Sequence, residues 1–564
     1  MTLHTLESKT PDIPTVKLSA PPLAVLSQSN MAAAGRELGD FASRPDAAVA
    51  KVQEDLTGRD RVLRSFVSGW LPQFLQIASG FVLPRLISDQ LGQGSLGIWD
   101  FGWTVVSYFA LLQGGIVSSV NRYVARHRAT GDFAGVNQSV NSVRLVLNAI
   151  AILTAILTVL AAWLLPRMMH QQLGGLTSEA SGVLLLLGFT SAVQIQGAVF
   201  GGILTGCHRW TVHNAIKAGT AIVSVGGGLL VIGCGGNIVM LSGVMLASEI
   251  LMRAAQRVAA LRVCPELTLS RKSFDWPKAK EMMHFGGKSY LTVISQMFSN
   301  QTTSLIVAST FGVGALALFS RPRNLIRSVA SVVQLNAMVM VPMVSAIEAG
   351  GRIEELRQLA ISGTRYAVFF CLPVLIFLLV MGRDVMQLWM GVSYVNQAIL
   401  GVFAVSGLVE AMSFPLHRVL MGMNRHGRIA TLNLIAAGMG ASIAGLCVLH
   451  PARNLLWVAI SLALPSLLVN GLLLPLASAR ILQLPLRQLI GETWRLPVLC
   501  CLPGTVCLLT VALALDASPL LRILSAAAAA AAGSAFLFWK HALPGPLKAG
   551  TARRLRFASH QVSA

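Results

Sequence analysis

Apolar runs long enough to cross a membrane follow one another from residue 65 to residue 540 almost without pause. A helix needs about 20 residues to cross the hydrocarbon core, and each run reaches that length. The pattern predicts an all-α polytopic membrane protein of about fourteen transmembrane helices. The expected spans are 65–88, 97–121, 140–165, 181–206, 214–234, 237–260, 285–310, 317–346, 361–383, 396–421, 429–449, 455–479, 496–515 and 518–540.

The charge pattern supports a membrane protein and predicts its orientation. Only 12% of the 564 residues are charged, whereas a soluble domain carries about 25% charged residues. The net charge of +21 would suggest a nucleic-acid partner if the Lys and Arg residues were clustered. They lie instead mostly in every second gap between the spans, and the gaps on the opposite side hold few, which is the positive-inside pattern. We therefore expect both termini in the cytoplasm and no nucleic-acid partner.

The segment 288–344 departs from both patterns. Its first span carries many polar side chains, and Arg321, Arg323 and Arg327 lie on the expected outer side of the next span. Hydroxyl, amide and guanidinium groups are costly in hydrocarbon, so they normally face a protein interior or a wet cavity. We predict that this hairpin forms one wall of a water-filled, cationic cavity in a transporter. The alternatives are arginines that snorkel to the lipid headgroups and polar residues that bond neighbouring helices.

Three sets of residues are candidates for function. The candidate substrate-binding residues are polar or basic and lie on this hairpin or on the matching first span: Arg323, Arg327, Arg321, Ser295, Gln296, Ser299, Asn300, Gln73 and Gln76. Basic residues near span ends are candidate gates or first contacts for a substrate, or else simple interfacial anchors: Arg85, Arg122 and Lys288. Acidic residues in spans are candidates for ion coupling: Glu249, Glu410 and Asp100.

Two observations limit this list. Glu249 has an alternative role as the partner of Arg253 one helical turn away. The chain contains no nucleotide-binding fingerprint and no metal-ligand spacing of Cys and His, so we expect no cofactor.

An internal repeat appears when the chain is shifted by 220 residues. Gly92 then aligns with Gly312 and Gly131 with Gly351, and the G-x-G-x-L turn is shared. Six spans separate the copies, so both copies enter the membrane in the same direction, and a substrate site is expected at their interface. The predicted organisation is a disordered cytoplasmic tail (1–60), an N-lobe of six spans (61–262), a cytoplasmic linker (263–284), a C-lobe of six spans (285–480), two accessory spans (481–541) and a basic cytoplasmic tail (542–564).

Sequence motifs in both halves resemble a known family. The first half carries Leu91-Gly92-Gln93-Gly94-Ser95-Leu96-Gly97-Ile98-Trp99, followed by Asn121-Arg122-Tyr123-Val124-Ala125-Arg126, and the second half carries Leu388-Trp389-Met390-Gly391 and Met421-Gly422-Met423-Asn424-Arg425. Over residues 60–480 the chain resembles the polysaccharide-biosynthesis flippases, which are lipid-linked oligosaccharide flippases of the MATE-like multidrug/oligosaccharidyl-lipid/polysaccharide exporter superfamily.

The resemblance implies a fold and a function. Members have two six-helix lobes, often with two added helices, and move lipid-linked glycans across the bacterial inner membrane by alternating access. It implies a transporter rather than an enzyme, whose substrate is a polyprenyl-pyrophosphate-linked oligosaccharide for exopolysaccharide, O-antigen or capsule synthesis. The implied partners are the anionic glycan lipid, bilayer lipids and a polysaccharide polymerase with its chain-length machinery. An ion-coupled multidrug or metabolite exporter on the same scaffold is the alternative.

Overall fold

The computed structural model describes residues 59–113, 116–338, 340–450, 454–538 and 540. Within these ranges, the side chains of residues 59–67, 118, 285–293, 295–296, 298–300, 342 and 535–536 lie outside the description. The predicted tails, 1–60 and 542–564, also lie outside it, apart from the backbone of residues 59 and 60.

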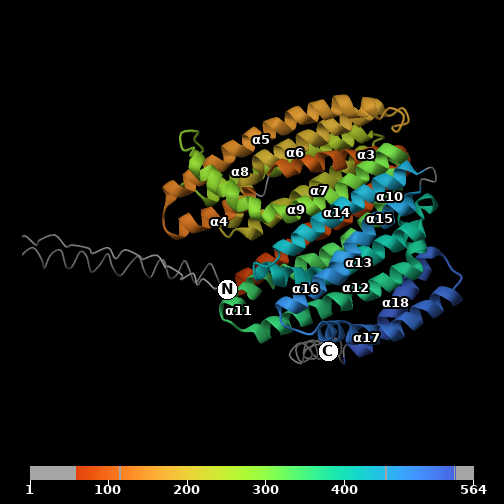
Figure 1. The fold of residues 1–564 in the computed structure, drawn as a ribbon. Coiled ribbons are helices and arrows are strands. Elements are labelled where there is room, and N and C mark those ends of the chain that lie inside the picture. Colours follow the sequence, from red (N-terminus) through yellow and green to blue (C-terminus); the bar gives the residue numbers. More distant parts are fainter. Residues whose placement is uncertain (1–58, 114–115, 339, 451–453, 539, 541–564) are drawn as a thin grey trace, which may run out of the picture. The chain divides into compact units, whose positions relative to one another are not determined.

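All the elements in the described ranges are helices (Figure 1). The first half contains α3 (Arg59–Phe109), η1 (Ala110–Gln113), α4 (Ile116–Ala129), α5 (Phe133–Met168), α6 (Thr177–Gly206), α7 (Trp210–Gly233) and α8 (Ile238–Val263). The second half contains α9 (Trp276–Phe311), α10 (Val313–Ala337), α11 (Met340–Ala349), α12 (Ile353–Met390), η2 (Val392–Tyr394), α13 (Gln397–Gly422), α14 (Gly427–Leu449), α15 (Leu455–Leu467), η3 (Leu468–Leu473) and α16 (Leu474–Ile481). The chain then forms α17 (Leu486–Ala514) and α18 (Pro519–Leu537).

Ten helices among the described residues are long and apolar enough to cross a membrane. This confirms the prediction of an all-α polytopic membrane protein. One of the ten, Ser68–Gln113, covers most of the first two predicted spans. The helices α9 and α10 are not among the ten, because the polar side chains of α9 and the arginines of α10 make both less apolar than an ordinary span.

The backbone repeats at the positions that the sequence repeat aligns. Gly92 (φ 86°, ψ 166°) interrupts α3, and Gly312 (φ 86°, ψ 168°) separates α9 from α10. Gly131 and Gly351 also match, with φ values of 69° and 66°. Residues with a side chain rarely adopt such positive φ values, which explains why glycine occupies these turns in both halves. The local geometry therefore agrees with the predicted repeat.

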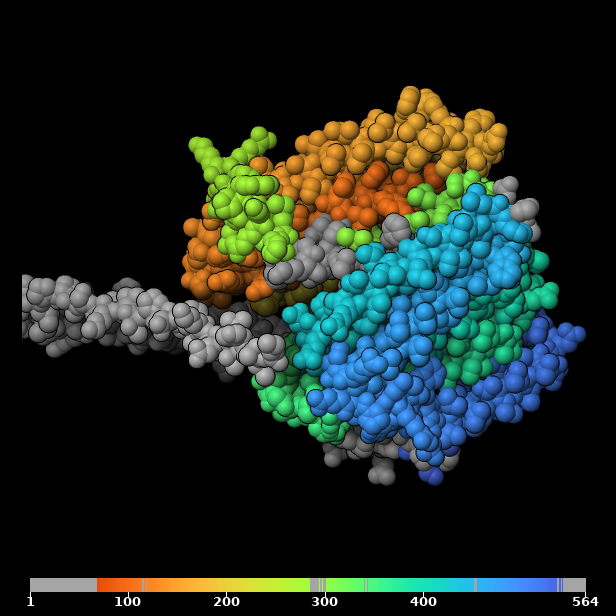
Figure 2. All heavy atoms as spheres, viewed as in Figure 1, coloured from red at the N-terminus to blue at the C-terminus, as the bar shows by residue number. Residues whose placement is uncertain are grey.

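Helices within each half also contact one another. The helix α9 packs along α14, and in the first half Ser68 of α3 accepts a hydrogen bond from Asn214 of α7 at 3.0 Å. Around these pairs, α5, α6 and α8 pack together, and α12 packs against α13, α17 and α18. In Figure 2, α14 and α15 form part of the molecular surface, coloured cyan to light blue.

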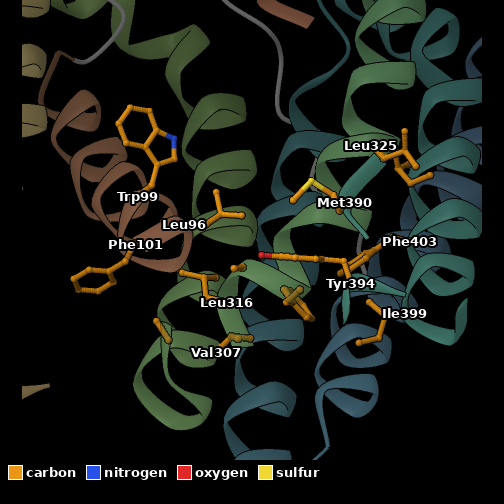
Figure 3. Packing of buried hydrophobic residues seen from close by; sticks show 14 of the residues in the cluster. Leu96, Trp99, Phe101, Val307, Leu316, Leu325, Met390, Tyr394, Ile399 and Phe403 are labelled. Atoms are coloured by element: carbon orange, nitrogen blue, oxygen red, sulfur yellow. The ribbon is translucent and has the colours of Figure 1, made fainter. Parts of the chain in front are cut away.

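The largest hydrophobic cluster joins helices of both halves near Gly92 and Gly312. It includes Leu96 and Phe101 of α3, Leu316 of α10 and Phe403 of α13, all of them buried (Figure 3). The packing is close: a Cβ added to Gly97 of α3 would lie 2.0 Å from the carbonyl oxygen of Val313. The described side chains are therefore closely packed at this end of the seam between the two halves.

Candidate functional site

A cavity of about 600 Å³ lies further along the same helices. It is lined by α3, α10, α13, α14 and α15 and by the π-helical turn η3. A volume of this size falls within the usual range of small-molecule sites. The lining includes Gln73 and Gln76, which extend from α3 toward the second half of the chain.

Two predicted arginines line this cavity. Arg323 and Arg327 lie one turn apart on α10, so they share a face of the helix. Arg327 is exposed to the cavity, and the guanidinium group of Arg323 donates to Ser304 Oγ at 3.3 Å. On the neighbouring helix, Gln73 Nε2 donates to Ser331 Oγ at 3.3 Å. The polar residues of the first span and the arginines of α10 thus meet at one cavity.

Glu410 of α13 is the acidic residue of the cavity lining. Its carboxylate lies close enough to Arg327 and Arg323 to interact with both charges, and it is also near the hydroxyl group of Ser466. Two basic side chains and one carboxylate leave an excess of positive charge in this part of the cavity. Such a site favours an anion and offers a carboxylate as an acceptor for hydroxyl groups.

Arg321 does not lie in this cavity. It is buried, with 1% of its side chain exposed, and its guanidinium group forms an ion pair with Asp100 of α3. The carboxylate of Asp100 therefore neutralises the charge of Arg321, and the guanidinium group does not face the cavity. Asp100, a candidate for ion coupling, is thus the ion-pair partner of Arg321 in this conformation.

Other polar contacts join the two halves around this ion pair. Gln93 Nε2 donates to the carbonyl of Gly314 at 2.9 Å, and Trp389 Nε1 donates to the carbonyl of Phe81 at 2.9 Å. Arg85 binds Asp89 at 2.6 Å and the carbonyl of Trp389 at 3.2 Å. These contacts and the hydrophobic cluster close the seam at the end marked by Gly92 and Gly312. We call this region the glycine-end seal.

The remaining candidates fall into two groups. Glu249 pairs with Arg253 at 2.6 Å, as the alternative interpretation predicts, and Arg122 is exposed near the middle of α4. The side chains of five others lie outside the described residues, although their backbone belongs to α9: Lys288, Ser295, Gln296, Ser299 and Asn300.

The sequence interpretation missed one wall of the cavity. His417, Asn433, Ser466 and Asn470 all line it, and they come from α13, α14, α15 and η3. Each is a polar residue in an apolar span, which is the same signal that singled out α9. These residues are scattered over three spans, so they form no recognisable stripe in the sequence.

Known structures with this fold are transport proteins. An inward-facing multidrug resistance MATE family transporter of the MOP superfamily superposes with a TM-score of 0.61 at 15% identity, covering 74% of this chain and 98% of the other. The lipid II flippase MurJ, in an inward closed conformation, gives a TM-score of 0.62 at 12% identity, covering 85% and 99%. A MOP superfamily transporter from Pyrococcus furiosus gives 0.54 at 14% identity, covering 76% and 97%. The fold is that of MATE-like transporters.

The sequence comparison is more specific. Residues 134–399 match the model of the family described as "Polysaccharide biosynthesis protein". No curated protein matches the chain. The predicted resemblance to polysaccharide-biosynthesis proteins with a MATE-like fold is thus confirmed.

Proposed function

We propose that this protein is a flippase that moves a polyprenyl-pyrophosphate-linked oligosaccharide across the bacterial inner membrane, for exopolysaccharide, O-antigen or capsule synthesis. The observation that carries the proposal is the position of Arg323 and Arg327, which line a cavity between helices of both halves. Arginine binds phosphate oxygens through its planar, multiply donating guanidinium group, so this pair suits a pyrophosphate. The match to polysaccharide biosynthesis proteins supports a glycan-bearing lipid as the substrate.

In this proposal the chain forms fourteen spans in two lobes. The helices α3–α8 make the N-lobe, α9–α16 the C-lobe, and α17 and α18 are accessory. With both termini in the cytoplasm, the glycine-end seal lies on the outer side of the membrane. The cavity then receives the headgroup from the cytoplasmic side while the polyprenyl tail stays in the bilayer. Opening of the seal and closure of the other end expose the headgroup outside.

A reconstituted transport assay tests this proposal. Wild-type protein in vesicles is expected to move a fluorescent polyprenyl-pyrophosphate-linked glycan between leaflets, and the Arg323→Gln/Arg327→Gln variant is expected to lose this transport. The Arg323→Lys/Arg327→Lys variant should keep part of it, because the charge remains while the bidentate geometry is lost. The matched control is Arg257→Gln, which removes an exposed arginine of α8 outside the cavity lining. Full transport by the double glutamine variant would refute the role of this pair.

One observation favours the second candidate function, an ion-coupled exporter of a drug or metabolite. Glu410 places a carboxylate in the cavity, and an intramembrane carboxylate is a natural carrier of a coupling ion. In that case Glu410→Gln would abolish uptake of a small cationic substrate driven by an ion gradient. In the flippase, the same substitution would leave binding of the pyrophosphate in place.

A further inference from the structure

The wall of the cavity missed by the sequence interpretation contains a connected set of neutral polar groups. We call His417, Asn433, Ser466 and Asn470 the amide cluster. Asn470 Nδ2 donates to Ser466 Oγ at 3.3 Å and lies 3.4 Å from Asn433 Oδ1. His417 Nε2 lies 3.0 Å from Asn470 Oδ1 and donates to it. Hydrogen bonds thus connect four polar side chains of α13, α14, α15 and η3 in one wall of the cavity.

The backbone is irregular at this place. Residues 468–473 form a π-helical turn between α15 and α16, and Asn470 lies at its centre. π-Helical turns are rare and occur frequently at functional sites. The carbonyl oxygen of Asn470 accepts a hydrogen bond from Ser413 Oγ at 2.7 Å, which stabilises the irregular turn from the neighbouring helix. The hydrogen bond from Ser413 thus stabilises the π-helical turn. This turn places the side-chain amide of Asn470 next to His417, Asn433 and Ser466.

The amide cluster still has hydrogen-bonding capacity to offer. An asparagine amide nitrogen has two N–H donors, and no described residue accepts a hydrogen bond from Asn433 Nδ2. Glu410 lines the same cavity and lies near Ser466 of the cluster as well as near Arg327 and Arg323. The carboxylate of Glu410 is therefore the junction between a cationic part of the cavity and a neutral, amide-lined part.

We propose that the amide cluster and Glu410 bind the sugar that is attached directly to the pyrophosphate. This inference rests on the proposed function, in which Arg323 and Arg327 hold the pyrophosphate. Sugar hydroxyl groups both donate and accept, so they match a site that combines amide N–H donors with a carboxylate acceptor. The cavity volume of about 600 Å³ suits a small headgroup. In this proposal the cavity therefore binds the pyrophosphate and the first sugar and does not contact the rest of the glycan.

A binding experiment with two kinds of probe tests the inference. The probes are decyl pyrophosphate and decyl pyrophosphate that carries glucose, galactose or N-acetylglucosamine, titrated into the purified full-length protein in nanodiscs. The wild type is expected to bind at least one sugar-bearing probe about tenfold more tightly than decyl pyrophosphate. The Asn433→Leu and Ser466→Ala variants should reduce this preference by roughly three- to tenfold per lost hydrogen bond, with unchanged affinity for decyl pyrophosphate. Asn336→Leu is the matched control, because Asn336 is exposed on α10 and is absent from the cavity lining.

The possible outcomes separate this inference from the proposed function. A wild type without any sugar preference would overturn the inference, and so would cluster variants that keep the preference or lose affinity for both probes equally. The Arg323→Gln/Arg327→Gln variant should lose affinity for every probe. If that variant still binds decyl pyrophosphate normally, the proposed pyrophosphate site is wrong, whatever the cluster variants show.

Discussion

The ion pair between Asp100 and Arg321 should control how long the glycine-end seal stays closed. Arg321 is 1% exposed and Asp100 is 12% exposed, so removing either partner leaves a charge in a place that water does not reach. Breaking a buried pair in this way costs about 3–5 kcal/mol. When the two halves separate at this end, water reaches the remaining charge and most of the cost disappears. We therefore expect Asp100→Asn to shift the equilibrium between the closed and open seal by roughly a hundredfold or more.

Cross-linking across the seal measures this shift. In a background without native cysteines, Gln93→Cys and Gly314→Cys place one thiol on each half, and a Cβ at Gly314 fits at 3.5 Å from the Gln93 amide nitrogen. A short bifunctional maleimide should link the pair efficiently in the otherwise wild-type protein and poorly after Asp100→Asn or Arg321→Gln. The double variant Asp100→Asn/Arg321→Gln should recover much of the yield, because it leaves no unpaired charge. Equal yields in all four proteins, with unchanged thermal unfolding, would refute the reasoning.

Three further predictions concern other parts of the structure. Gly97→Ala should lower the thermal unfolding temperature and the cross-linking yield, because its new Cβ would meet the Val313 carbonyl at 2.0 Å and overpacking costs about 1–3 kcal/mol; a variant as stable as the wild type would contradict the close packing of α3 on α10. The thiols of Cys207 and Cys264 lie 2.9 Å apart just beyond the ends of α6 and α8, and the hydrogen bond from Cys264, together with nearby Arg128, lowers the pKa of Cys207 to about 7. Diamide should therefore join these two thiols faster as the pH rises through 7, with mass spectrometry as the readout and Cys207→Ser as the control, and a rate independent of pH would disprove the thiolate. The Asp132 side chain caps α5 by accepting a hydrogen bond from Gly135 N, and this bond lowers the pKa of Asp132 from its usual value of 3.8. Its contribution to helix stability is therefore complete above pH 3.8 and is lost as the pH falls below that value. Hydrogen exchange at the start of α5 should rise at low pH in the wild type and be high at all pH values in Asp132→Ala.

Much of the architecture was predictable because membrane spans and glycine turns leave local signals. Apolar length alone predicts helices, and the spacing of Gly92 and Gly312 predicts two turns that indeed share one backbone geometry. The polarity of α10 likewise predicted that Arg323 and Arg327 face a cavity. Each of these features depends on residues that lie near one another in the chain, so each can be recognised from one sequence.

The partners of individual charges were not predictable in the same way. Arg321 carries the same side chain as Arg323, and only the approach of α3 brings Asp100 to it. The amide cluster combines α13, α14, α15 and η3, and its π-helical turn has no recognised sequence signal. Both features depend on which helices become neighbours, and that information lies in tertiary packing rather than in the periodicity of any one span.

Arg321 and Arg323 are two residues apart on α10, with Pro322 between them. Successive residues of a helix are about 100° apart around its axis, so these side chains leave α10 on nearly opposite sides. One faces Asp100 across the seam, and the other faces the cavity. A rotation of α10 that draws Arg323 toward a headgroup must turn Arg321 through the same angle and pull it away from its carboxylate. Movement of α10 alone would thus link binding of the headgroup to loss of the Arg321–Asp100 ion pair.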